Sequence, residues 1–431
     1  MIKTIRNAWA IPDLRKKILF TIFALLIFRL GSVVPVPYVN TGMLGTYLTS
    51  MSGSILGLIG AMNGSAFSVA AVFALGVQPY INSSIIIQLL TVAIPALERL
   101  QKDGGEEGRK KIAAITRYVT VAIALLQGFG YFTLINSNGI LESGVNTVLA
   151  GVVIIISLTA GSAFVMWLGE QITEFGIGNG ISIILFAGIL SRVPMAVLSM
   201  TAMPWWIWPL VVVGTLLLIV FIVFISDSER RIPVQYAKRV VGRKMYGGQS
   251  SHIPMKVNMS GVMPIIFAQA IASIPATICA FAGVQAGDEG FWGAFLEVFD
   301  ANGLIYAIVY FLLILGFSYF YASMSFSPVE VANNLKKNGG FVPGFRPGKP
   351  TADFIKRVLS KITLFGAIYL SIIALLPIIT ANIIDLASGT TMGQSLAIGG
   401  TSVIIVVGVA LETAKALEAQ MMMRHYKGFL E

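Results

Sequence analysis

The sequence predicts an all-α integral membrane protein with ten transmembrane helices. Three observations support this prediction. Of the 431 residues, 56% are hydrophobic and only 12% are charged. The apolar residues come in runs of about 20, and the basic residues gather in alternate loops. A soluble domain has about a quarter of its residues charged, so the solvent of this chain is a lipid bilayer.

The ten predicted spans follow one another with polar segments between them. The N-terminus has the cations and the apolar run of a signal peptide, but no small-residue cleavage site follows. We therefore interpret it as a retained first span. The spans were placed where apolar runs approach the length that crosses about 30 Å of hydrocarbon. They are residues 18–36, 70–92, 112–135, 147–168, 178–196, 206–225, 261–282, 303–323, 361–384 and 398–418.

The distribution of basic residues tests this arrangement. If the basic N-terminus is cytoplasmic, successive loops alternate between the two sides, and cytoplasmic loops should be rich in lysine and arginine. None of the 30 lysines and arginines falls in a predicted outward loop, and only Arg192 lies near one. The long loops 226–260 and 324–360 lie on the basic side. We predict that both termini are cytoplasmic.

One outward segment is unusual. Residues 52–67, "SGSILGLIGAMNGSAF", are apolar and rich in glycine but too few to cross the hydrocarbon layer. A re-entrant segment enclosed by protein would explain them, because backbone that does not span is tolerated at membrane depth only in such surroundings. An amphipathic helix lying on the membrane surface would explain them equally well.

A second unusual segment lies on the basic side. Residues 336–351, "KKNGGFVPGFRPGKPT", contain four cations, four glycines and three prolines. Each proline fixes φ and removes a backbone donor. We expect a stiff basic loop here that forms neither helix nor strand.

The residues that enzymes, metals and cofactors need are scarce. The chain has two histidines, His252 and His425, without a partner at ligand spacing, and its single cysteine, Cys279, lies in an apolar run. "PGKPT" is not a phosphate-binding loop, because Pro343 stands where that motif has its first glycine and Pro350 follows the lysine. We expect no enzyme activity, no metal and no cofactor.

The glycines of "GIGNG", residues 176–180, have the spacing of a dinucleotide-binding loop. No strand precedes them, and that motif requires one. We interpret them as a tight turn at the start of the fifth span.

Five stretches of the chain together resemble one family, that of SecY, the central subunit of the bacterial Sec protein-conducting channel. The resemblance covers the full length, in the same order and with the same ten spans. The stretches are "ALGVQPYINSSIIIQLL" (74–90), "GIGNGISIILFAGI" (176–189), "VGRKMYGGQSSHIPMKVN" (241–258), "FVPGFRPGKPT" (341–351) and "GGTSVIIVV" (399–407).

The resemblance implies two inverted five-helix halves, residues 1–200 and 201–431, which close like a clamshell around an hourglass pore. The pore would open sideways to lipid between spans two and three on one side and spans seven and eight on the other. Such a channel passes unfolded secretory polypeptides across the bacterial plasma membrane and releases membrane-protein helices laterally into it.

The resemblance also implies a ring of aliphatic side chains at the constriction and a plug that closes it. An apolar constriction excludes water and ions by dewetting, yet its walls can part around a polypeptide. The plug favours the re-entrant interpretation of residues 52–67. The ring residues are Ile81, Ile85, Ile181, Leu185, Ile266 and Ile405, and the plug residues are Ser54, Ile55, Leu56, Leu58, Ile59 and Met62.

In this family the two basic loops bind the ribosome or the SecA motor ATPase. Basic tips suit ribosomal RNA, because phosphate contacts give affinity that does not depend on sequence. Small SecE-like and SecG-like membrane subunits, signal peptides, nascent polypeptides and lipid are the other implied partners. The docking residues are Lys238, Arg243, Lys244, Arg346 and Lys349.

Three glutamines, Gln88, Gln127 and Gln269, lie in the second, third and seventh spans, where they could hydrogen-bond across the lateral opening or hold packed helices together. A secondary transporter of a small solute is the alternative function. It would need buried charge pairs near the membrane centre, and the sequence offers few. An intramembrane enzyme would need a catalytic pair within the spans, and the sequence has none.

Overall fold

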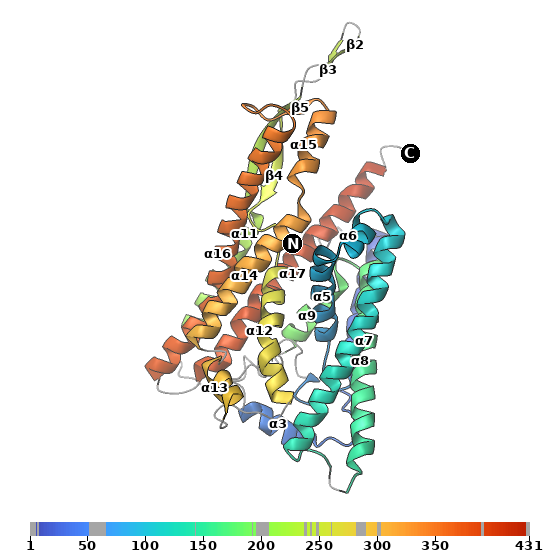
Figure 1. Ribbon diagram of the computed structural model, residues 1–431, viewed down its shortest axis with the longest axis vertical. Coiled ribbons are helices and arrows are strands. Elements are labelled where there is room, and N and C mark those ends of the chain that lie inside the picture. The colour runs from blue at the N-terminus through green and yellow to red at the C-terminus, as the bar shows by residue number, and fades with distance from the viewer. Residues whose placement is uncertain are drawn as a thin grey trace.

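The protein is a bundle of long helices with a small sheet at one end (Figure 1). The computed structural model describes residues 6, 8–50, 66–142, 144–191, 193–194, 207–236, 239–241, 244–246, 250–259, 261–281, 290–299, 303–388 and 392–427.

The first half of the chain forms one group of helices. Within it, α2 packs against α8 and α9, α5 against α7, and α8 against both α7 and α9. The short helix α6 follows α5 after a break at Ile94, where the chain bends by 105°. The helices are α2 (Pro12–Gly31), α3 (Thr41–Ser50), α5 (Gln78–Ala93), α6 (Pro95–Lys102), α7 (Gly105–Ser137), α8 (Thr147–Phe175) and α9 (Gly180–Leu190).

The second half forms another group. Here α16 packs against both α14 and α17, α12 against α14, and α11 against α17. Helix α12 also contacts α5 and α7, and α17 contacts α9, so these contacts join the two groups. The helices are α11 (Ile207–Asp227), α12 (Met263–Phe281), α13 (Phe291–Val298), α14 (Leu304–Ser325), α15 (Pro328–Lys337), α16 (Lys349–Ser388) and α17 (Met392–Lys427).

A helix overlaps each of the ten predicted spans. Among the described residues, four helices are long and apolar enough to cross a membrane by themselves, or five if the bent pair α5 and α6 counts as one span. Three shorter apolar helices accompany them, at Gly180–Leu190, Val212–Asp227 and Met263–Cys279. The long ones are Gly105–Ser137, Thr147–Phe175, Leu304–Lys337 and Lys349–Thr380.

The second predicted span begins too early. Helix α5 starts at Gln78, and residues 66–77 form a series of turns that are mostly buried. Such backbone needs partners from the surrounding protein. Val36 N–H donates to the Ala70 carbonyl at 2.9 Å, and the Tyr131 hydroxyl donates to the Phe67 carbonyl at 2.7 Å. The segment is buried yet hydrogen-bonded by the residues around it.

The loop expected to form neither helix nor strand contains both. Lys336 and Lys337 end α15, Gly340–Phe341 forms strand β5, and Lys349 begins α16. The expectation was wrong because it considered only the glycines and prolines of the segment itself. Partners from another loop make the strand possible.

Those partners come from the other long loop. Strand β1 (Glu229–Tyr236) pairs antiparallel with β4 (Ser250–Lys256) along its length and with β5 at its end, where Tyr236 lies opposite Gly340. Between β1 and β4 lies the hairpin of β2 (Arg239–Val241) and β3 (Lys244–Tyr246), which projects at the top of Figure 1. An apolar core joins the sheet to α15 and α16; it includes Ile232, Val234, Met255, Leu335, Val342, Ile355 and Leu359. The two loops therefore form one folded unit.

Candidate functional site

The six predicted ring residues come together in one apolar cluster where the two groups of helices meet. Ile81 and Ile85 lie on α5, Leu185 on α9, Ile266 on α12 and Ile405 on α17, each at most 4% exposed. The sixth, Ile181 on α9, is partly buried against the same cluster. Four elements far apart in the sequence thus contribute aliphatic side chains to a common core.

The turn before α9 sets the direction of its two ring residues. Gly178 has a φ of +67°, and the Asn179 side chain accepts hydrogen bonds from the backbone N–H groups of Ile181 and Ser182 at 3.1 and 3.4 Å. A Cβ atom on Gly180 would overlap the carbonyl oxygen of Gly169 on α8. The "GIGNG" stretch is therefore a tight helix start, as predicted, and the structure shows that Asn179 caps it.

An open cavity of about 510 Å³ lies against the ring. Ile81, Ile181, Leu185 and Ile266 form part of its wall. The rest of the wall is largely polar and comes from α5, α7, α8, the turn before α9, and the ends of α12 and α14 that are nearest the sheet. These polar residues include Tyr80, Ser84, Gln88, Arg117, Glu170, Thr173, Glu174, Asn179, Ser182 and Tyr321. An apolar layer and a polar cavity thus adjoin each other inside the bundle.

An ion pair that the sequence did not predict lies in the wall of this cavity. Arg117 Nε donates to Glu170 Oε1 at 2.8 Å and joins α7 to α8. The arginine side chain is 53% exposed and the glutamate 25%, so solvent screens the attraction. Arg117 was visible as a cation within a span, but nothing in the sequence points to its partner 53 residues away.

The three glutamines differ in their hydrogen bonds and burial. Gln88 Nε2 donates to the Ser84 hydroxyl, one turn earlier on α5, at 3.2 Å. Gln269 is buried on α12, and its Oε1 has no hydrogen-bond partner among the described residues. Gln127 is half-buried on α7. Their helices do meet, since α12 contacts both α5 and α7.

The remaining predicted residues lie partly outside the described chain. All six plug residues, Ser54, Ile55, Leu56, Leu58, Ile59 and Met62, fall outside the described residues, as do Lys238 and Arg243 and the outward-end residue Arg192.

The other docking residues lie at the sheet end of the molecule. Lys244 begins strand β3 of the projecting hairpin. Arg346 is exposed in the turn between β5 and α16, and its carbonyl accepts a hydrogen bond from the Thr351 hydroxyl at 2.7 Å. Lys349 is exposed at the first residue of α16.

Known structures share this fold. Over 94% of this chain and 92% of the other, the helices superimpose with a TM-score of 0.62 and 18% identity on a structure described as that of a protein conducting channel. The TM-score is 0.60 at 17% identity for Sec61 in the canine ribosome-channel complex from the endoplasmic reticulum, again over 94% and 92% of the two chains. The shared fold and the long apolar helices together define an α-helical membrane protein.

Sequence comparison identifies the family. The SecY family model matches residues 71–414. The protein translocase subunit SecY of Mycobacterium bovis is 44% identical over 434 residues, which cover 97% of each chain, and that of Streptomyces scabiei is 41% identical over 447 residues, which cover all of each chain. The chain belongs to the SecY family.

Proposed function

We propose that this chain forms the pore of a protein-conducting channel, which passes unfolded polypeptides across a membrane and releases membrane-protein helices sideways into lipid. The observation that carries the proposal is that the six predicted ring residues, from α5, α9, α12 and α17, belong to or pack against one apolar core, and that this core adjoins an open cavity with many polar side chains. The relatives named as translocase subunits support the same function.

The chemistry of the ring favours a channel over a carrier of small solutes. A constriction without charge binds no ion, excludes water, and discriminates little among polypeptides of different sequence. A carrier needs polar or charged groups at its binding site to recognise a solute. The six ring residues offer none, which favours a conduit over a carrier.

The lateral opening lies, in this proposal, where α12 faces α5 and α7. These contacts join residues 1–200 to residues 201–431, which would move apart as two halves hinged between α9 and α11. Gln88, Gln127 and Gln269 lie on the three helices concerned, and polar side chains between membrane helices contribute about 0.6 kcal/mol each. Such small contributions would hold the opening closed while leaving it easy to open.

The sheet end would bind the partners that supply the polypeptide. The projecting hairpin with Arg243 and Lys244, together with Arg346, offers cations to ribosomal RNA or to a motor ATPase such as SecA. The Sec61 structure was determined in a ribosome complex, which supports the ribosome as one partner. In this proposal the sheet end and both termini are cytoplasmic, the membrane is the bacterial plasma membrane, and SecE-like and SecG-like subunits complete the assembly.

Site-specific crosslinking tests the pore. A secretory precursor with a folded C-terminal domain is arrested halfway through reconstituted channels, and a photoreactive residue in its arrested stretch reports its neighbours. We expect adducts at Ile81, Ile181, Ile266 and Ile405 that require the motor and ATP. Ile86, next to ring residue Ile85 on α5 but 41% exposed on the bundle surface, is the matched control and should give no such adduct. Adducts at Ile86 alone would contradict the pore assignment.

Ion conductance tests the plug. Deletion of residues 52–67 should let ions leak through a channel that remains inserted in the membrane. A carrier with the same deletion would instead lose solute uptake without conducting ions.

A further inference from the structure

The turn that carries Arg346 is fastened to the sheet unit on both sides of that residue. Phe345, immediately before it, stacks against Phe354 of α16, with ring centroids 4.2 Å apart and an interplanar angle of 27°. Thr351, in the first turn of α16, is only 1% exposed, and its hydroxyl donates to the Arg346 carbonyl at 2.7 Å. Arg346 itself is exposed. An exposed side chain thus projects from a backbone that is held by the folded unit behind it.

The backbone of this turn has little conformational freedom. Gly344 and Gly348 have φ values of +86° and +101°, a region that favours glycine. Prolines fix φ at three further positions, which are Pro343, Pro347 and Pro350. The turn is therefore close to the shape that the structure shows before any partner binds.

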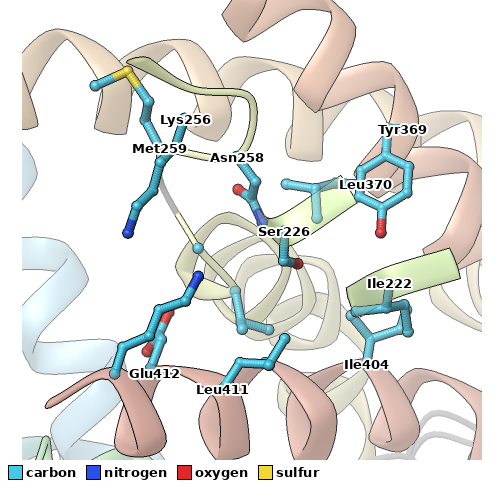
Figure 2. A pocket seen from close by; sticks show the side chains of 14 residues that line it. Ile222, Ser226, Lys256, Asn258, Met259, Tyr369, Leu370, Ile404, Leu411 and Glu412 are labelled. Carbon is cyan, nitrogen blue, oxygen red and sulfur yellow. The ribbon is translucent and has the colours of Figure 1, made fainter. Parts of the chain in front are cut away.

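The sheet unit is fastened at its base as well. A cavity of about 180 Å³ lies where the unit joins the helices, and Figure 2 shows Asn258, from the loop between β4 and α12, in its wall with Tyr369 of α16 and Glu412 of α17. The Glu412 carboxylate accepts a hydrogen bond from the Val262 backbone N–H, at the end of the same loop. A Cβ atom on Gly408 of α17 would overlap the Val262 side chain. The unit is thereby held against α17, one of the four helices that carry the ring.

The sheet unit carries an excess of positive charge around this turn. Between residues 328 and 357 the exposed carboxylates are those of Glu330 and Asp353, whereas six cations are exposed. RNA presents many phosphates in a row, so several cations on one unit favour RNA over a single acidic side chain as the partner. The cations are Lys336, Lys337, Arg346, Lys349, Lys356 and Arg357.

We propose that Phe345, Phe354 and Thr351 are positioning residues, which hold Arg346 where it binds a phosphate of ribosomal RNA. This inference rests on the docking role proposed above for Arg346. The ring stack and the threonine hydrogen bond act from the side of the folded unit, and their effect is to order the turn before binding. Ordering a flexible loop during association lowers affinity, and a turn that is already ordered avoids this loss.

Binding of vacant bacterial ribosomes to the full-length protein in nanodiscs tests the proposal. Arg346→Ala should weaken binding about tenfold. It should also lower the slope of log affinity against log salt concentration by about 1, because one phosphate contact is lost. Thr351→Val nearly keeps the shape of the buried side chain but removes the hydroxyl, and should weaken binding about fivefold. Thr351→Ser keeps the hydroxyl and should bind like the unchanged protein.

A double-mutant cycle separates positioning from a general effect on folding. In the Arg346→Ala background, Thr351→Val should have no further effect on binding, because the side chain that it positions is absent. Phe354→Leu removes the stacked ring but keeps an apolar side chain; it should behave in the same way and keeps the test valid if Thr351→Val fails to fold. Thr363→Val, the same substitution at another buried position of α16, is the matched control and should leave binding unchanged in both backgrounds.

Three results would overturn the proposal, and they are distinguishable. If Thr351→Val and Phe354→Leu bind like the unchanged protein, or lose the same factor with and without Arg346, the three residues do not position it. If the coupling is found with the purified motor ATPase but not with ribosomes, Arg346 binds a protein and not RNA. If Arg346→Ala itself leaves ribosome binding and its salt dependence unchanged, the proposed docking role of Arg346 fails, and this inference fails with it.

Discussion

The buried core around Ile85 and the open cavity beside it are built from the same helices but differ in chemistry, although four of the six predicted ring residues line the cavity as well. Ser84 and Ile85 are neighbours on α5, yet Ser84 faces the cavity while Ile85 is 3% exposed among the aliphatic side chains. Successive residues of a helix point about 100° apart. A single helix can therefore line a wet space and a dry layer at the same depth.

The difference teaches how a barrier can be both tight and easy to open. In the cavity, groups such as Arg117 and Glu170 hold one another by directed bonds. The six predicted ring residues belong to or pack against an apolar core, where dispersion contacts have no required geometry. Contacts of this kind reform after the walls have parted, whereas a directed bond must find its partner again.

Moving a carboxylate across this boundary should have the largest effect. Ile85→Asp places a charge in the dry layer, which costs about 3 kcal/mol at the centre of a membrane helix, and it should also make the closed channel conduct ions. Ser84→Asp adds the same group to a cavity that already holds carboxylates and should cost less than about 1 kcal/mol. Denaturant unfolding and bilayer conductance are measured for both variants. Equal effects would mean that Ser84 and Ile85 do not lie in different surroundings.

The turn that directs α9 should be the next most sensitive point. Gly180→Ala forces a Cβ atom against the Gly169 carbonyl, so α9 must shift and carry Ile181 and Leu185 with it, at about 2 to 3 kcal/mol. Gly214→Ala, in α11, meets no atom within 4 Å and should stabilise the protein by up to about 1 kcal/mol. Thermal unfolding compares the two; similar losses would mean that the close approach is unimportant.

A smaller change probes the packing of the ring itself. Ile405→Val removes one methylene group from a fully buried site and should cost about 1 kcal/mol. Ile86→Val, on the exposed side of α5, should cost almost nothing. If both were neutral in denaturant unfolding, the ring would be loosely packed.

The ion pair of the cavity should contribute least. A double-mutant cycle with Arg117→Gln and Glu170→Gln should give a coupling free energy of about 0.5 kcal/mol, because the arginine is 53% exposed. The coupling should fall further in 1 M salt. A coupling above about 2 kcal/mol would show that the cavity wall is less hydrated than the exposure indicates.

Much of the fold could be predicted because hydropathy marks the segments within the membrane and the basic residues mark the side on which each loop lies. Each predicted span contains a helix, since an apolar run must satisfy its backbone internally. Hydropathy could not show that residues 66–77 are not helical, because their partners, such as Tyr131, lie on distant helices. The pairing of Arg117 with Glu170 could not be predicted either, because it depends on how α7 and α8 pack.

The candidate sites were less predictable from local sequence patterns than the helices were. The six ring residues came from a family resemblance, because an isoleucine in a membrane helix has no local signal that separates pore from packing. Strand β5 was missed because it has only two residues and pairs with β1, which lies about a hundred residues earlier in the sequence. The small cavity at Tyr369 and Asn258 draws on four separate segments, and no single stretch of the sequence indicates it.

The pairing of β1 with β5 has a consequence for how the chain is synthesised. Tyr236 must wait for Gly340, roughly a hundred residues later, which takes about 5 to 20 s at ordinary rates of translation. During this interval Gln235 and Tyr236 lack their partners in β5, and uncovered strand edges can pair with other chains. The same strand carries Arg230 and Arg231, both exposed. Charged residues on a strand edge disfavour such pairing, and these two would continue to do so after β5 has paired, because β5 covers only Gln235 and Tyr236.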